Sequence, residues 1–185
     1  MDTSFSLNRL SRLVACLITT FAMFVAASPA SADCAEGSLP LRWIDAIEHQ
    51  EWDAMAAMLS DDATYHDPTM AYYDRPEISL TGPKAIAAFW REASDDSGTS
   101  VIDYSNAGCF ETGPMAVLTL HVAVTVSGNY WGVNRDEITL RGAQTTVLRL
   151  ENGKIRAVTD LVNYAGVTEQ VESLQAQYGK TTLSE

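Results

Sequence analysis

Apolar residues recur three and four positions apart in the part of the chain that follows residue 32, and this spacing predicts helices. The stripes of the three expected helices are Leu41, Ile44 and Ile47; Trp52, Met55, Ala56 and Leu59; and Ile86, Phe89, Trp90 and Ala93. Pro40 suits the first turn of the first helix. Asp61-Asp62 is expected to end the second helix, and Gly82-Pro83 to open the third.

The rest of the chain is dominated by segments with the composition and alternation of strands. Strands are expected over residues 63–66, 101–110, 115–126, 137–150 and 155–164, with a terminal helix over 168–178. Asn152-Gly153 is a two-residue hairpin signal between the last two strands. Pro68 restricts the preceding Asp67 to extended geometry, so the first strand ends there and residues 69–81 are expected to form a loop. Helices followed by antiparallel strands predict an α+β fold, with the helices on one face of a sheet.

The first 32 residues have the pattern of a secretory signal peptide. Arg9 and Arg12 form a positive region, residues 13–27 are apolar apart from two threonines, and Ala30-Ser31-Ala32 supplies small residues for cleavage. The apolar run, about 15 residues, is too short for a membrane span. We therefore expect a single mature domain over residues 33–185 that is secreted or periplasmic, without membrane attachment after cleavage.

Charge narrows the range of partners. The chain carries 12 Lys and Arg against 24 Asp and Glu, a net charge of −12. Phosphate groups and anionic lipids attract basic surfaces, so this balance argues against nucleic-acid binding and against electrostatic membrane binding. Hydrophobic residues make up 46% of the chain and charged residues 19%, which is typical of a globular domain.

Cys34 and Cys109 are the cysteines that remain once a leader containing Cys16 is removed. In an oxidising compartment we expect them to form a disulfide that ties the mature N-terminus to the body of the domain. Two separately buried thiols are the alternative.

Residues 42–68, which end in Asp67-Pro68, resemble the matching region of bacterial ketosteroid isomerases, and Gly82 then precedes a helix with Ile86 and Phe89. The whole order of elements resembles the SnoaL-like branch of the nuclear-transport-factor-2-like superfamily. This resemblance implies a cone-shaped α+β fold in which a curved, barrel-like, mixed or antiparallel sheet and N-terminal helices enclose an apolar pocket. Members include isomerases, dehydratases, polyketide cyclases, epoxide hydrolases and non-catalytic binding modules, so the resemblance implies a fold and leaves the activity open.

Asp67 is the first candidate catalytic residue. A carboxyl group in an apolar pocket has a raised pKa, which suits general acid or base catalysis near neutral pH. The resemblance places Asp67 at the general-base aspartate of the ketosteroid isomerases, whereas a simple Asp-Pro turn is the alternative. Those isomerases also need a tyrosine and a protonated aspartate to stabilise an enolate oxygen. The matching positions here are Trp43 and Thr146, so a true ketosteroid isomerase is not expected.

Asp160 and His121 are the other catalytic candidates. Asp160 lies among apolar residues of a predicted strand, where a lone charge is costly unless it is paired or functional. It resembles the pocket aspartate of limonene-epoxide-hydrolase-like proteins, although their accompanying Arg and Asp are absent here; an edge-strand charge facing solvent is the alternative. His121 lies on the Val117 and Thr119 side of its strand, and alternation does not decide whether this side faces the pocket, solvent or a dimer partner. In the pocket, His121 and Asp160 would form an acid–base pair.

The candidate substrate-binding residues are Trp43, Glu48, Tyr65, Tyr72 and Tyr73. Glu48 matches, by resemblance, a helix-borne aspartate of scytalone-dehydratase-like enzymes, and a solvated helix carboxylate is the alternative. Tyr65 lies on the same side of its strand as Asp67. Tyr72 and Tyr73 lie in the expected loop, where they would donate a phenol hydrogen bond, cover the pocket mouth or serve packing alone.

The three histidines, His49, His66 and His121, have no close metal-ligand spacing, and no phosphate-binding glycine loop is present, so neither a metal nor another cofactor is expected. Two hypotheses stay open. The first is a cofactor-independent acid–base enzyme of lyase, isomerase or hydrolase type, such as an isomerase, dehydratase or epoxide hydrolase, acting on a small hydrophobic molecule. The second is a non-catalytic ligand-binding or dimerisation module. Homodimerisation through the outer sheet face is a further expectation.

Overall fold

The computed structural model describes residues 33–73 and 76–181, so the expected signal peptide lies outside the described residues. Its helices are α2 (Leu39–Glu48), α3 (Trp52–Ala57), α4 (Pro83–Ser97) and α5 (Tyr164–Tyr178), with short 3-10 helices η1 (Pro68–Tyr73) and η2 (Asn129–Trp131). Within the described residues, none of these helices has the length and apolar character needed to cross a membrane.

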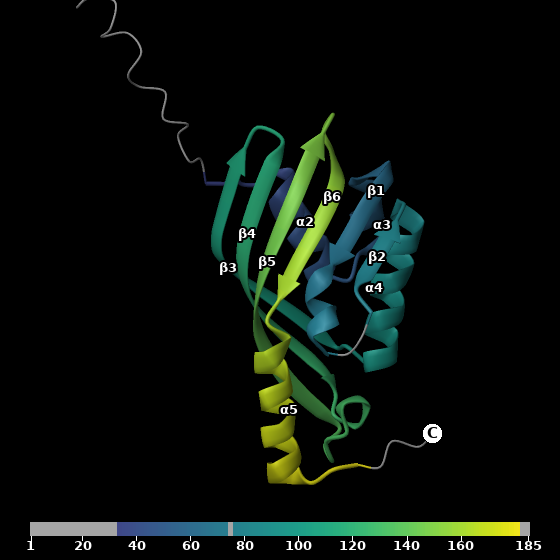
Figure 1. The fold of residues 1–185 in the computed structure, drawn as a ribbon, viewed down its shortest axis with the longest axis vertical. Helices are drawn as coiled ribbons and strands as arrows, with labels where there is room; N and C mark the ends of the chain where they lie inside the picture. Colours follow the sequence, from purple (N-terminus) through teal and green to yellow (C-terminus); the bar gives the residue numbers. More distant parts are fainter. Residues whose placement is uncertain (1–32, 74–75, 182–185) are drawn as a thin grey trace, which may run out of the picture. The chain divides into compact units, whose positions relative to one another are not determined.

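One six-stranded sheet forms the centre of the fold (Figure 1), in the order β2-β1-β6-β5-β4-β3. Its strands are β1 (Leu59–Asp67), β2 (Ile78–Thr81), β3 (Val101–Thr112), β4 (Met115–Ser127), β5 (Glu137–Glu151) and β6 (Lys154–Val162). The pairing of β1 with β6 is parallel, and the other four pairings are antiparallel. The predicted α+β class with a mixed, mostly antiparallel sheet is therefore confirmed.

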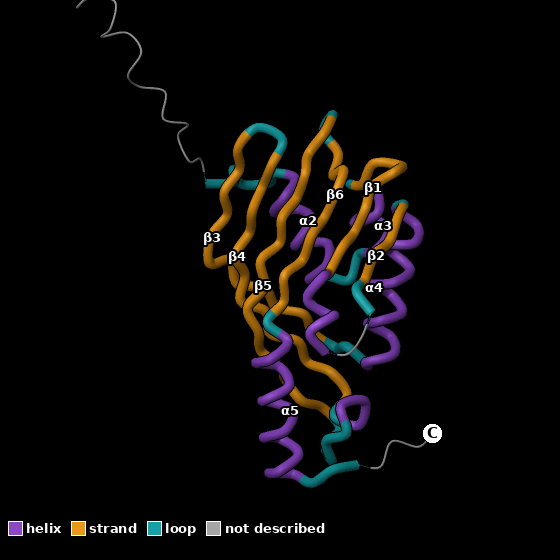
Figure 2. The backbone as a smooth tube through the Cα atoms, viewed as in Figure 1, coloured by secondary structure: helices purple, strands orange, loops and turns teal. Residues whose placement is uncertain are grey.

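The N-terminal helices pack with the strands around one apolar core (Figure 2). Trp43 of α2, Met55 of α3 and Ile86 of α4 are fully buried, as are Leu118 and Leu148 of the sheet. Burial of this apolar surface stabilises the fold by about 1.5–3 kcal/mol for each large side chain. Helix α5 instead contacts the part of β5 that extends beyond β6, where a second, smaller apolar cluster lies.

Three boundaries differ from the predicted ones. The second helix ends at Ala57, and residues 59–62 belong to β1 because Leu59 pairs with Ile155 of β6. Part of the expected loop forms the edge strand β2, which pairs with β1 and has too few residues for a recognisable pattern. Helix α5 begins at Tyr164, where the Asn163 side chain accepts a hydrogen bond from the Gly166 N–H and caps the helix.

Cys34 and Cys109 form the expected disulfide, with 5.4 Å between their Cα atoms. The bond joins the segment before α2 to strand β3 across a sequence separation of 75 residues. It therefore closes a long loop that includes β1, β2 and the first three helices.

Replacement of both cysteines by serine is expected to lower the free energy of unfolding by about 2–4 kcal/mol, because the unfolded chain regains the freedom that the loop closure removes. Urea unfolding of residues 33–185, followed by circular dichroism, measures this loss. Thiol titration of the denatured wild type without reductant should find no free thiol, and two titratable thiols would contradict the disulfide.

Candidate functional site

Asp67 and Asp160 lie on neighbouring strands, at the same level of the sheet. In the parallel β1–β6 pair, Tyr65 is opposite Val158 and His66 is opposite Thr159, and the two aspartates come next on their strands. Each aspartate is 1% exposed. Because side chains alternate along a strand, both lie on the buried face that Tyr65 and Val158 also occupy. The structure thus brings together two of the three predicted catalytic residues, whose roles stay a prediction.

Asp160 is held by hydroxyl groups. The Tyr65 hydroxyl donates to Oδ2 at 2.8 Å, and the Thr146 hydroxyl donates to Oδ1 at 2.6 Å. Thr146 lies directly opposite Asp160 in the β5–β6 pair, and its oxygen accepts a hydrogen bond from Gln144 Nε2 at 2.9 Å. The residues of this network are all buried, so their polar atoms depend on one another and not on water.

Burial raises the pKa of the Asp160 carboxyl to about 6. The hydrogen bonds from Thr146, Tyr65 and Gln144 act in the opposite direction, and the negative charge of Asp67 raises the pKa further. Among the salt bridges of the described residues, none involves Asp160. A carboxyl group that titrates near neutral pH can both accept and donate a proton under physiological conditions.

Asp67 is held mainly by its own turn, in contrast to Asp160. Its Oδ1 accepts hydrogen bonds from the backbone N–H of Thr69, at 2.9 Å, and from the Thr69 hydroxyl, while its Oδ2 accepts from the Tyr164 hydroxyl at 2.6 Å. The bond to the N–H two residues ahead is the pattern by which aspartate stabilises a turn, here the start of η1. The geometry therefore shows the turn role that was the alternative for Asp67, inside the same buried cluster as Asp160.

Two tyrosines donate to the carboxylates, Tyr65 to Asp160 and Tyr164 to Asp67, and a third, Tyr104, shares their raised pKa. Burial is the main cause that raises the pKa of Tyr65, Tyr104 and Tyr164 above the ordinary value. The negative charge of Asp160 raises all three pKa values further.

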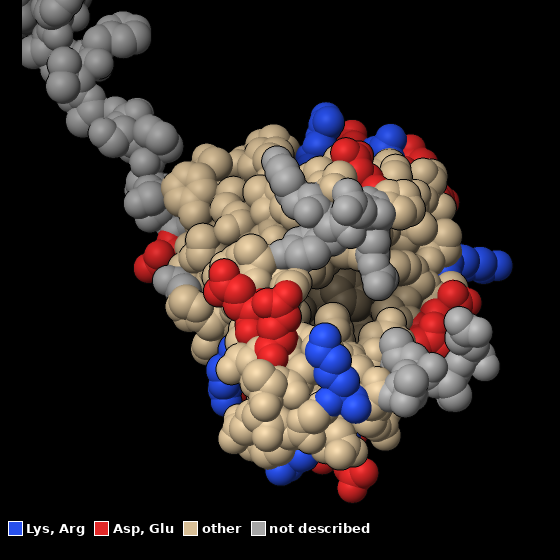
Figure 3. All heavy atoms as spheres, turned by 60° about the horizontal axis from the view of Figure 1, so that its bottom comes forward, with Lys and Arg blue, Asp and Glu red and all other residues tan. Residues whose placement is uncertain are grey.

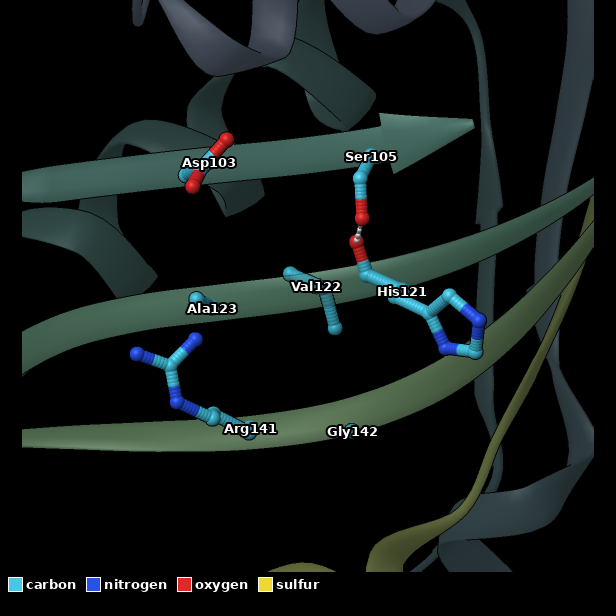
Figure 4. A pocket seen from close by; sticks show the side chains of 7 residues that line it. All are labelled: Asp103, Ser105, His121, Val122, Ala123, Arg141 and Gly142. Atoms are coloured by element: carbon cyan, nitrogen blue, oxygen red, sulfur yellow. Dashed lines mark hydrogen bonds between the residues drawn. The ribbon is translucent and has the colours of Figure 1, made fainter. Parts of the chain in front are cut away.

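The structure shows the alternative position for His121, outside the interior, so the pair with Asp160 that a pocket position would allow does not form. His121 is exposed and lies opposite Ser105 of β3 and Ala143 of β5, while the adjacent Leu120 is buried. Strand alternation therefore places His121 on the face of the sheet opposite to Asp160. There it lines an open groove of about 420 Å³ (Figure 4), together with Asp103, Ser105, Val122, Ala123, Arg141 and Gly142.

The other predicted substrate-binding residues lie in different parts of the fold. Trp43 is fully buried on α2, and Glu48 is half-buried at the end of this helix, where its charge contributes to the raised pKa of Tyr104. The side chains of Tyr72 and Tyr73 lie outside the described residues. Within the part of the chain that the structure describes, no group of three or more His, Cys, Asp and Glu residues could hold a metal ion.

Sequence reasoning missed Gln144 and Tyr164 as members of the cluster. Gln144 and Thr146 are two successive polar residues on the buried face of β5, between Leu140 and Leu148. Such a polar interruption of an apolar face is a signal that could have identified Gln144. Tyr164 carries no comparable signal, because its contact with Asp67 depends on where α5 begins.

The surface of the domain is hollowed on the side turned forward in Figure 3. Uncharged residues form the depth of this hollow, and acidic and basic side chains lie beside it (Figure 3).

The SnoaL-like domain family matches residues 41–158. A SnoaL-like polyketide cyclase, so described, from Shewanella denitrificans is 20% identical, with a TM-score of 0.64 over 73% of this chain and 95% of its own. An epoxide hydrolase from M. tuberculosis, related to limonene epoxide hydrolase, is 12% identical, with a TM-score of 0.57 over 75% of this chain and 90% of its own. No curated protein sequence matches the chain. At these low sequence identities, the TM-scores show a likeness of fold alone.

The stability of the domain should depend on pH through Asp160. Folding raises the pKa of Asp160 from 3.8 to about 6. The contribution of Asp160 to the free energy of unfolding is therefore fully present below pH 3.8 and is lost as the pH rises through 6. The difference in free energy of unfolding between wild type and Asp160→Asn should therefore change by on the order of 2–3 kcal/mol across this window, to the disadvantage of the wild type at high pH. Urea unfolding at several pH values measures it. A difference that stays constant from pH 3.5 to 7.5 would contradict the raised pKa.

Proposed function

Because the chain belongs to the SnoaL-like domain family, we propose that it binds a small, largely apolar molecule and uses Asp160 to transfer a proton without a cofactor. The observation that carries this proposal is the environment of Asp160, a carboxyl group that is 1% exposed, held by two hydroxyls, and free of any salt bridge among the described residues. Burial without a cation keeps the proton affinity of this carboxyl high.

Asp160 is better suited to proton transfer than Asp67. Burial raises the pKa of Asp160 to about 6, so this carboxyl holds and releases a proton closer to neutral pH than an ordinary aspartate does. Asp67 accepts three hydrogen bonds, two of which come from Thr69 in its own turn. We assign Asp67 the role of positioning Tyr164 and of raising the proton affinity of Asp160 through its charge.

The reaction class follows from what a single titrating carboxyl can do. Isomerisation, dehydration and epoxide hydrolysis each require a proton to be removed from, or delivered to, the bound molecule. The fold-level neighbours are described as a polyketide cyclase and an epoxide hydrolase, which agrees with a site of this kind. We propose an activity within this range.

A non-catalytic ligand-binding module is the second candidate. It is favoured by the position of His121 on the opposite face of the sheet and by the turn role of Asp67, which leave Asp160 as the main titrating group. In that case the buried cluster around Asp67 and Asp160 would bind a ligand without catalysing a reaction.

We also propose that the domain is exported. The leader pattern of residues 1–32 supports this, and so does the disulfide between Cys34 and Cys109, since such bonds persist in oxidising compartments. Mass spectrometry of the protein from a native envelope fraction is expected to find a chain that begins after Ala32.

General-base activity can be tested without the natural substrate. The probe is 5-nitrobenzisoxazole, a small apolar molecule that opens when a base removes its ring C–H proton and the N–O bond breaks to give a phenolate. We expect ring opening to be accelerated, with a rate that rises through about pH 6 as Asp160 loses its proton. Asp160→Asn should lower the rate by about 100-fold or more, measured by phenolate absorbance.

Asp103→Asn is the matched control, because Asp103 is an exposed aspartate on the outer face of the sheet. It should leave the rate unchanged, and Asp67→Asn should have a smaller effect than Asp160→Asn. If the wild type gives no acceleration while apolar ligands raise its melting temperature, the binding module is correct and the enzymatic proposal is wrong.

A further inference from the structure

The connection between β4 and β5 carries a polar pocket that the proposed function does not use. Its volume is about 480 Å³, within the range of roughly 300–1,000 Å³ that small-molecule sites occupy. It lies far from the buried carboxylates: Glu137 begins β5 and Thr146 lies in its second half, so about 30 Å of strand separate them. The lining side chains are all polar and exposed, and they belong to Asn129, Asn134, Arg135, Asp136 and Glu137.

Hydrogen bonds fix the backbone of this connection. The Gly128 N–H donates to the Asp136 carbonyl at 3.1 Å, and the Val133 N–H donates to the Gly128 carbonyl at 2.9 Å. The Asn134 N–H donates to the carbonyl of Gly179, which follows α5, at 3.0 Å. Figure 1 shows α5 at the same end of the domain as this connection. The pocket side chains thus extend from an ordered backbone, which lowers the entropic cost of binding a ligand.

The polar atoms of the lining side chains have no partner among the described residues. The Arg135 guanidinium lies over the ring of Tyr178, with Cζ 4.6 Å from the ring centroid, and makes no salt bridge in this part of the chain. Within the same described residues, hydrogen bonds and salt bridges are also absent from the side chains of Asn129, Asn134, Asp136 and Glu137. Five polar groups around one pocket are therefore free to bind a ligand.

The mixture of these groups determines the kind of ligand. The carboxylates of Asp136 and Glu137 only accept hydrogen bonds, the guanidinium of Arg135 only donates them, and the two asparagine amides do both. Two carboxylates against one guanidinium repel an anion, while the guanidinium opposes a cation. A hydroxyl group is neutral and both donates and accepts, so a ligand with several hydroxyl groups matches all five side chains.

Exposed aromatic side chains lie next to this polar pocket. Tyr130 directly follows Asn129 and is 46% exposed, and Tyr178, beneath Arg135, is 36% exposed. An aromatic ring offers a flat apolar surface. A sugar ring has a complementary shape, with C–H groups on one face and hydroxyl groups around its edge.

We propose that this pocket binds a neutral saccharide, with the hydroxyl groups of the sugar on the polar side chains and its apolar face on a tyrosine ring. The site is separate from the one around Asp160 and takes a ligand of opposite character. Helix α5 and the residues after it, which hold the pocket backbone, lie outside residues 41–158. The pocket therefore depends on a part of this chain that the SnoaL-like family match does not include.

The test is a titration of the ¹⁵N-labelled domain over residues 33–185 with D-glucose, D-galactose, D-mannose and N-acetyl-D-glucosamine at millimolar concentrations. We expect at least one of these sugars to move the backbone N–H signals of residues 134–137 and the side-chain amide signals of Asn129 and Asn134, in a saturable manner. Cyclohexanol has a ring of the same size with a single hydroxyl and should leave these signals unchanged. Glucose 6-phosphate should bind more weakly than glucose, because its charge is repelled by the carboxylates.

Variants of the exposed side chains identify the groups that bind the sugar. Asp136→Asn combined with Glu137→Gln should weaken sugar binding by about 10-fold or more, the loss expected when hydrogen bonds to charged groups are removed. Tyr130→Ala should weaken it by about 2- to 10-fold through loss of the aromatic contact. Asp103→Asn is the matched control, because Asp103 is an exposed aspartate in the groove on the outer face of the sheet, and it should leave sugar binding unchanged.

The saccharide site is overturned if none of the neutral sugars moves these signals, or if cyclohexanol moves them as much as the sugars do. Binding of glucosamine without binding of glucose would also reject it, because this result identifies a site for cations. The ring-opening assay depends on Asp160 alone, so the failure of either proposal leaves the other standing.

Discussion

The parallel pairing of β1 with β6 is the contact on which the rest of the site depends. It is the only parallel pair in the sheet of the described residues, and it joins the beginning of the domain to its last strand. Parallel neighbours point residues of equal register to the same face, so Asp67 and Asp160 end up side by side in the interior. An antiparallel arrangement of these strands would bring Asp67 to the opposite end of β6.

This pairing places two carboxylates close together in an apolar interior, and hydroxyl groups of the chain donate hydrogen bonds to both. Two carboxylates in an apolar interior are costly unless their charge is compensated or removed. Here the compensation comes from Tyr65 and Thr146 for one aspartate, and from Thr69 and Tyr164 for the other. Neutral donors reduce the cost without an ion pair, so the proton affinity of Asp160 stays high.

Most elements of the fold follow from local patterns in the sequence, because apolar periodicity reports directly on burial. The helix stripes, the long strands and the Asn152-Gly153 hairpin all have such patterns. The edge strand β2 does not, since its four residues are ordered by pairing with β1. The disulfide could be expected because the mature chain offers a single pair of cysteines.

The site was less accessible to sequence reasoning. Asp160 stood out as a charge among apolar residues, and Asp67 was found through resemblance. The face of His121 stayed open, because alternation separates two faces of a strand and gives no information on which one is interior. The contact of Tyr164 depends on the starting point of α5, which the Asn163 cap sets. Long-range geometry of this kind is not encoded in any single segment.

The hydrogen bond between Tyr65 and Asp160 spans 95 positions of the chain, and the bond between Tyr164 and Asp67 spans 97. Apart from Tyr65 and Thr69, the hydroxyl groups that hold the two carboxylates come from β5 and from the start of α5. A chain that is still being synthesised consequently lacks the assembled cluster until its final third has joined the sheet. Contacts of such high sequence separation form late and slowly during folding. The buried environment that raises the pKa of Asp160 is therefore created only when folding is complete.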